Sequence, residues 1–133
     1  MFAAYKTPTG SYRSLSVETS VADASPHGLI AMLYDGAVES VLRARGALTR
    51  GDIAGRGAAI TRAIRIVDEG LKASLDARGG EIAKNLSDLY AYISHRLLSA
   101  NLEASEAALI EVQQLLSQLR DGWNGIANSP AAV

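Results

Sequence analysis

The sequence predicts an all-α protein, an antiparallel up-down-up-down four-helix bundle with a flexible N-terminal segment. Apolar residues recur at spacings of three and four along four stretches of roughly 18–25 residues, which is the period of an amphipathic helix. Only a few residues separate these stretches, and connections that short make neighbouring helices run antiparallel. We therefore expect a flexible segment over residues 1–24, the bundle over residues 25–124 and a frayed tail over residues 125–133.

The first helix is expected from about Pro26 to Leu48. The Ser25 hydroxyl can accept a hydrogen bond from an N–H of the first turn, and proline suits the first helical position because its missing N–H is not needed there. Apolar side chains then follow with little polar relief, at Leu29, Ile30, Met32, Leu33, Tyr34 and Ala37. One core-facing stripe does not require all of them, so the excess indicates a second surface that something else covers.

The second and third helices are expected on either side of a break at residues 78–80, where a glycine can take the left-handed cap conformation. The second runs from about Ile53 to Ala77, with Asp52 as its N-cap. Its apolar face carries Ile60, Ile64, Val67, Leu71 and Leu75. The third runs from about Glu81 to Leu102. Its apolar face carries Ile82, Leu86, Leu89, Ile93 and Leu97.

The fourth helix is expected from about Glu106 to Trp123, with Ser105 as its N-cap. Its apolar residues follow a strict alternation of three and four, which is typical of a bundle seam. They are Leu109, Val112, Leu116, Leu119 and Trp123.

The N-terminal segment has a different pattern from the helices. Proline and glycine interrupt it at residues 8 and 10, and the residues that follow alternate between apolar and polar. A single extended segment finds no ladder partner in a helical protein, so we expect it to be mobile or to lie along a groove. Tyr12, Leu15 and Val17 are the residues we expect to form a cover that a partner displaces.

Composition argues against several classes of protein. Thirteen basic and fourteen acidic residues give a formal net charge of -1, without the basic footprint of a nucleic-acid-binding protein. No apolar run reaches the roughly 18 residues of a membrane span, and the N-terminus lacks the pattern of a secretory signal peptide. There is no cysteine. We therefore expect a cytoplasmic protein without membrane insertion or nucleic-acid binding.

No residue pattern in the chain points to catalysis, a metal or a cofactor. His27 and His95 have no histidine partner at helical spacing, and no Glu-x-x-His motif of the di-iron bundles occurs. A nucleophile elbow is also missing. A helical enzyme stays the rival from a different class, and it would need charged side chains converging in an interior pocket. The basic residues Arg62, Arg65, Lys72, Arg96 and Arg120 instead fall outside the apolar stripes, which predicts solvated faces.

The surplus of apolar residues extends beyond the first helix. The simplest interpretation of any single extra residue is a broad buried face. Together, the extra residues favour partly apolar grooves of the kind that receive an amphipathic helix. The groove or groove-edge positions we expect are Tyr34, Ile66, Tyr92 and Ile110.

The chain also resembles a known family, the flagellar secretion chaperone FliS family. The strongest signature is the run Ala24-Ser25-Pro26 followed by Leu29-Ile30 and Met32-Leu33-Tyr34-Asp35-Gly36-Ala37. Five further blocks follow the order and spacing of the family, at residues 12–19, 64–71, 79–92, 96–101 and 111–123. The resemblance spans nearly the whole chain.

The resemblance implies a function and a set of partners. Proteins of this family bind the disordered C-terminal region of flagellin, which becomes helical as it wraps the bundle, and they thereby block premature polymerisation. It further implies that an export gate component recognises the complex. The alternative within the same resemblance is an adaptor for another flagellar regulator, an anti-sigma factor or a translation regulator. Neither of these two functional hypotheses involves an enzymatic activity.

Overall fold

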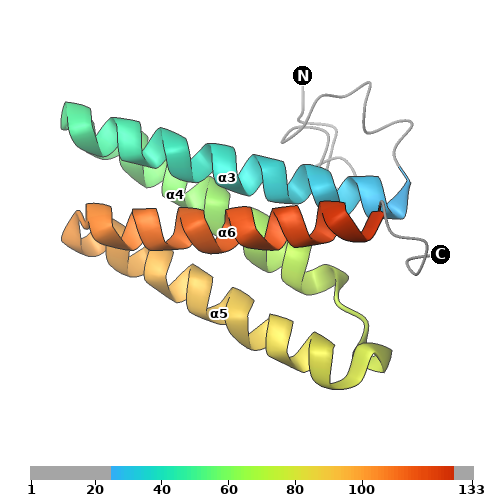
Figure 1. The fold of residues 1–133 in the computed structure, drawn as a ribbon. Helices are drawn as coiled ribbons and strands as arrows, with labels where there is room; N and C mark the ends of the chain where they lie inside the picture. The colour runs from blue at the N-terminus through green and yellow to red at the C-terminus, as the bar shows by residue number, and fades with distance from the viewer. Residues whose placement is uncertain (1–24, 128–133) are drawn as a thin grey trace, which may run out of the picture.

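The computed structural model describes residues 25–127, which form helices and turns without a β-strand. Four α-helices build this described part of the chain (Figure 1), and three short helical segments connect the second to the third. In chain order the elements are α3 (Pro26–Arg50), α4 (Ile53–Arg65), the π-helix η2 (Ile66–Leu71), the 3₁₀ turns η3 (Lys72–Ser74) and η4 (Ala77–Gly79), α5 (Gly80–Glu103) and α6 (Glu106–Ala127). The predicted all-α four-helix bundle is confirmed.

The four helices pack in a ring in which α3 lies between α4 and α6, and α5 lies opposite α3. Contacts between distant residues show that neighbours run antiparallel. Arg56 at the start of α4 donates to Asn101 at the end of α5, and Trp123 near the end of α6 donates to the His27 carbonyl at the start of α3. Figure 1 shows the same arrangement, with α5 splayed from the others toward its N-terminal end.

The helices begin where the capping residues predict. The side chains of Ser25 and Asp52 accept hydrogen bonds from the N–H groups of Gly28 and Gly55, at 3.1 and 2.9 Å. The Ser105 hydroxyl does the same at the start of α6. Gly51 ends α3 in the left-handed conformation, with φ at 72°, which suits a residue without a Cβ. This tight turn lets α4 fold back directly against α3.

The second predicted helix is not one continuous α-helix to Ala77. After Arg65 the chain widens into the π-helix η2 and then tightens into η3, ending at Ser74. Gly70 packs directly on Leu33 of α3. A Cβ added to Gly70 would lie 3.0 Å from Leu33 Cδ2. The wider π turn also directs Ile66, Val67, Gly70 and Leu71 inward together. Close packing against α3 therefore accompanies the departure from α-helical geometry.

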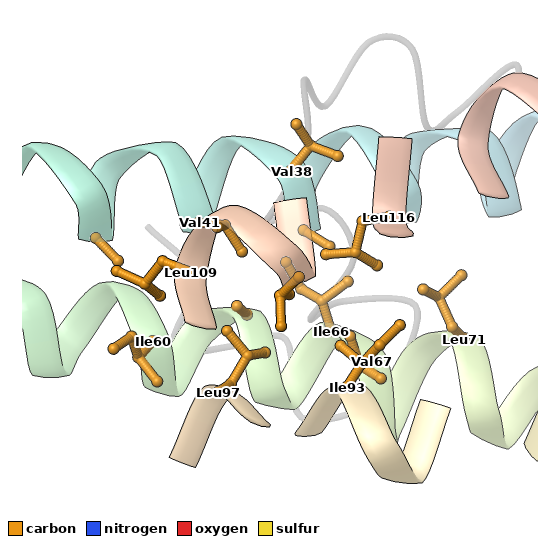
Figure 2. Close-up of a cluster of buried hydrophobic side chains, with 14 of the residues drawn as sticks. Val38, Val41, Ile60, Ile66, Val67, Leu71, Ile93, Leu97, Leu109 and Leu116 are labelled. Carbon is orange, nitrogen blue, oxygen red and sulfur yellow. The ribbon is translucent and has the colours of Figure 1, made fainter. Parts of the chain in front are cut away.

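The core is built from the predicted faces of all four helices, as Figure 2 shows. Its fully buried side chains include Val41, Ile60, Ile66, Val67, Leu71, Ile93, Leu97, Leu109, Val112 and Leu116. One predicted core residue is misplaced. Ile82 is 72% exposed, because the α-helix before α5 ends at Arg65 and the short segments η2, η3 and η4 take its place beside α5.

Two tyrosines form a polar contact inside this core. The hydroxyl oxygens of Tyr34 on α3 and Tyr90 on α5 lie 2.5 Å apart, and both side chains are buried. Burial raises the pKa of the Tyr34 hydroxyl, and burial and the same hydrogen bond raise that of Tyr90. Both groups are therefore neutral at ordinary pH. The bond joins the diagonal pair of helices through the middle of the bundle.

Candidate partner-binding surface

Two of the predicted groove residues lie in the core. Tyr34 is 3% exposed and Ile66 is 1% exposed, so neither lines an open groove. Tyr34 faces inward to reach Tyr90, and the π turn of η2 carries Ile66 inward with Val67. Their assignment to a groove is therefore corrected.

The other predicted contact residues are spread over different parts of the chain. Tyr12, Leu15 and Val17 lie outside the described residues. Tyr92 on α5 is 43% exposed, and Ile110 on α6 is half-buried. These two belong to the neighbouring helices α5 and α6, and their role in partner binding stays a prediction.

Tyr92 belongs to a polar cluster that ties α5 to α6. Its hydroxyl donates to Glu111 Oε2 at 2.5 Å, and Arg96 Nε donates to Glu111 Oε1 at 2.7 Å. The Tyr92 hydroxyl and the Arg96 guanidinium together lower the pKa of the Glu111 carboxyl. The same bond raises the pKa of Tyr92. The cluster fixes the ring of Tyr92 at the edge of α5 while leaving part of it accessible.

Helix α5 carries most of the exposed large apolar side chains. Leu98 is 51% exposed and Leu102 is 78% exposed, one turn apart on the same side of the helix. Ile82 lies open near the N-terminal end of α5, and Tyr92 lies on the edge beside α6. The exposed apolar side chains of α5 are thus distributed along its length and over more than one side of the helix.

A groove of about 670 Å³ lies on the outer face of α3 and α4. Its α3 wall is formed by Glu39, Ser40, Leu42, Arg43, Gly46, Ala47 and Arg50, and its α4 wall by Gly55, Ala58, Ala59 and Arg62. We call this the α3–α4 groove. Small residues on both walls create the hollow, because they leave space that longer side chains would fill. The sequence gives little signal for it, since glycine and alanine contribute weakly to an apolar stripe.

Several arginines predicted to lie on solvated faces instead join helices. Arg62 Nη1 of α4 donates to the buried Ser40 hydroxyl at 2.6 Å and to Glu39 Oε1 at 3.1 Å. Arg96 meets Glu111 across α5 and α6. These contacts are distributed over the bundle surface. They do not form the interior basic pocket that the rival helical enzyme would need.

Neither histidine is placed as a metal ligand. The His27 ring stacks on Trp123 with the ring centroids 4.2 Å apart, and His95 is exposed on α5. Residues 25–127 contain no group of three His, Asp or Glu side chains that could hold a metal ion. None of the helices in this range combines the length and apolar character needed to cross a bilayer.

A model of the family described as "Flagellar protein FliS" matches residues 8–130 of the chain. The chain belongs to the FliS family. Its relatives include the flagellar secretion chaperone FliS of Salmonella typhimurium, 50% identical over 117 residues, or 87% of each chain. FliSB of Pseudomonas aeruginosa is 43% identical over 88% of this chain and 93% of the relative.

A third relative, FliS of Escherichia coli, is 35% identical over 94% of this chain and 93% of its own length. All three relatives bear the name flagellar secretion chaperone. The family model's match over residues 8–130 includes all four helices of the bundle. The FliS resemblance expected from the sequence is confirmed, and the chain belongs to a family of flagellar chaperones.

Proposed function

We propose that this protein is a cytoplasmic export chaperone that binds the disordered C-terminal region of flagellin. It keeps flagellin from polymerising prematurely and keeps it competent for type III flagellar export. A component of the export gate then recognises the complex. Membership of the FliS family supports the chaperone role, and the exposed apolar surface of α5 is the observation that supports a flexible client.

The placement of the α5 side chains favours a client that wraps. Tyr92 lies at the edge beside α6. Leu98 lies toward the opposite edge, since Ser94, one turn before it, donates to Asp68 on the α4 side. A rigid helix laid along one groove would cover only one of these edges. A disordered chain that folds on contact covers both, because it can change direction between short helical pieces.

The charge and hydrogen-bonding pattern of the same surface suits reversible binding. The apolar side chains alternate with polar clusters such as Tyr92–Glu111–Arg96, in place of one continuous apolar patch. Ordering a disordered client also reduces the net affinity, since the lost chain entropy offsets part of the contact energy. A chaperone that must release its client at an export gate benefits from both features.

The test is a titration of the protein with a synthetic peptide covering the C-terminal region of flagellin. We expect heat of binding in calorimetry and a gain of helical signal in circular dichroism beyond the sum of the separate spectra. A scrambled peptide of the same composition is the control. Absence of both heat and added helicity with the flagellin peptide would exclude the proposed mechanism.

A further inference from the structure

The α3–α4 groove has the dimensions of a docking site for a helix. Its α3 wall extends from Glu39 to Arg50, roughly 16 Å or about three helical turns at 1.5 Å per residue. Gly46 and Gly55 lie in opposite walls. The end of the Arg50 side chain lies over Gly46, since an added Cβ would stand 3.1 Å from Arg50 Nη1, and the Asp52 carboxylate lies over Gly55. A partner side chain can enter above Gly46 when the flexible, exposed Arg50 side chain turns outward.

The rim of the groove carries more positive than negative charge. Arg43 and Arg50 stand on the α3 wall and Arg62 on the α4 wall, while Glu39 is the one acidic residue among those lining the groove. Glu39 already accepts from Arg62 at 3.1 Å and lies 3.8 Å from Arg43. Arg50 lies in the last turn of α3 at the other end of the groove. The floor between the arginines is alanine, glycine and part of Leu42.

Arg43 and Arg50 are seven residues apart on one helix, which separates them by about two turns, or roughly 10.5 Å. Gly46 lies between them on the same side of α3. A partner helix lying along the groove would place carboxylates at its positions i and i+7 opposite the two arginines, and an apolar side chain midway opposite Gly46. Helices that dock in grooves use anchors at this spacing.

We propose that the α3–α4 groove binds an acidic amphipathic helix of a partner protein. Its carboxylates pair with Arg43 and Arg50, and one aliphatic side chain fills the space above Gly46. Flagellin is not assumed to be this partner. A synthetic peptide unrelated to flagellin tests the groove, so its result and that of the flagellin titration are independent of each other.

The first test fills the groove. A fluorescent helical peptide of about three turns, with glutamates at i and i+7 and a leucine midway, is titrated into wild type and into Gly46→Leu. We expect saturable binding to wild type and a loss of more than about tenfold in affinity for the variant. Leucine favours helix over glycine and the exposed end of Arg50 can move aside, so Gly46→Leu keeps or raises the Tm. Gly122→Leu is the matched control, since a Cβ there meets nothing within 4 Å.

The second test reverses the charge. We expect the double variant Arg43→Glu with Arg50→Glu to bind the same peptide with an affinity lower by more than about tenfold. The double variant Lys72→Glu with Lys84→Glu carries the same charge change elsewhere on the protein and should bind the peptide nearly as tightly as wild type. A peptide with lysines in place of the glutamates should bind weakly. In ¹⁵N NMR spectra the Gly46 and Gly55 amides should shift on titration, and those of Gly122 and Gly125 should not.

Four results with the peptides would overturn the assignment. They are no saturable binding to wild type, equal weakening by both charge-reversed pairs, unchanged binding to Gly46→Leu, and equal binding of the lysine peptide. A single-stranded oligonucleotide serves as a further competitor. If it displaced the glutamate peptide and lost affinity for the same variants, the groove would be a site for phosphates rather than for an acidic helix.

Discussion

Tyr34 and Tyr90 share one hydrogen bond in a core that is otherwise aliphatic. Removing one hydroxyl leaves the other buried without a partner, which costs more than the bond itself contributes. We expect Tyr34→Phe to lower the free energy of unfolding by about 1–3 kcal/mol, measured by urea denaturation. The variant retains the ring, so loss of packing contributes little.

The double variant Tyr34→Phe with Tyr90→Phe is the decisive comparison for this pair. With both hydroxyls gone, no buried polar group is left unpaired, and such replacements are close to neutral. The double variant should therefore be more stable than the sum of the two single effects predicts. Simple additivity of the two single losses would show that the hydroxyls do not depend on each other.

Gly70 packs against a buried side chain of another helix, whereas an added Cβ at Gly55 or Gly79 would meet a residue three or four positions away in the same part of the chain. A methyl group at Gly70 would lie 3.0 and 3.1 Å from Leu33 Cδ2 and Cδ1, and both residues are buried. We expect Gly70→Ala to destabilise the protein by about 1 kcal/mol net, since overpacking outweighs the gain in chain stiffness. Gly122→Ala, measured by the same urea denaturation, should be neutral or stabilising. Equal stability of the two variants would contradict the close contact.

Helices α5 and α6 are joined at their surface by Glu111, which accepts from both Tyr92 and Arg96. These bonds hold the pKa of Glu111 below its ordinary value of 4.5. A group with a depressed folded-state pKa contributes stability above its unfolded pKa and loses that contribution as pH falls through the folded value. The contribution of Glu111 is therefore present at neutral pH and disappears below about pH 4.5.

Glu111→Gln isolates this effect, because glutamine does not titrate and every other carboxyl is common to both proteins. We expect wild type to have the higher Tm above about pH 5, with the difference shrinking steadily as the pH falls below 4.5. High salt should reduce the difference at neutral pH, since the side chains are partly exposed. A difference that is independent of pH would mean that the carboxylate charge does not support the α5–α6 contact.

The boundaries of the helices were largely predictable from local chemistry. Ser25, Asp52 and Ser105 cap helices through side-chain bonds that need only residues three positions away. The π-helix η2 was not predictable in this way, because it accompanies contact between Gly70 and Leu33 of another helix. The exposure of Ile82 likewise follows from the early end of the second helix.

At the scale of the whole molecule, the sequence predicted surplus apolar surface but not where it lies. Periodicity along one helix cannot distinguish a side chain that faces a neighbouring helix from one that faces solvent. Tyr34 and Ile66 were predicted at a groove or its edge and lie in the core, whereas Ile82 was predicted on the core-facing stripe and is exposed. The α3–α4 groove is formed by two helices together, so it is visible only once they are packed.

The exposed pair on α5 provides the most direct test of client binding on the whole bundle. Leu98 and Leu102 lie one turn apart and are exposed, so charging them should leave the Tm nearly unchanged. If the flagellin C-terminal peptide covers this edge, the double variant Leu98→Glu with Leu102→Glu should bind the peptide with an affinity lower by more than about tenfold. The reason is that desolvated charges replace two apolar contacts that binding buries. Calorimetry with the peptide measures the change.

The control carries the same charge change at the same spacing on another helix. Gln114 and Gln118 are exposed on α6 and, like the two leucines, are one turn apart. Gln114→Glu with Gln118→Glu should bind the peptide nearly as tightly as wild type, because no apolar contact is lost. If both double variants bound equally weakly, added negative charge alone would explain the loss. If both bound like wild type, the client would follow a path that avoids this edge of α5.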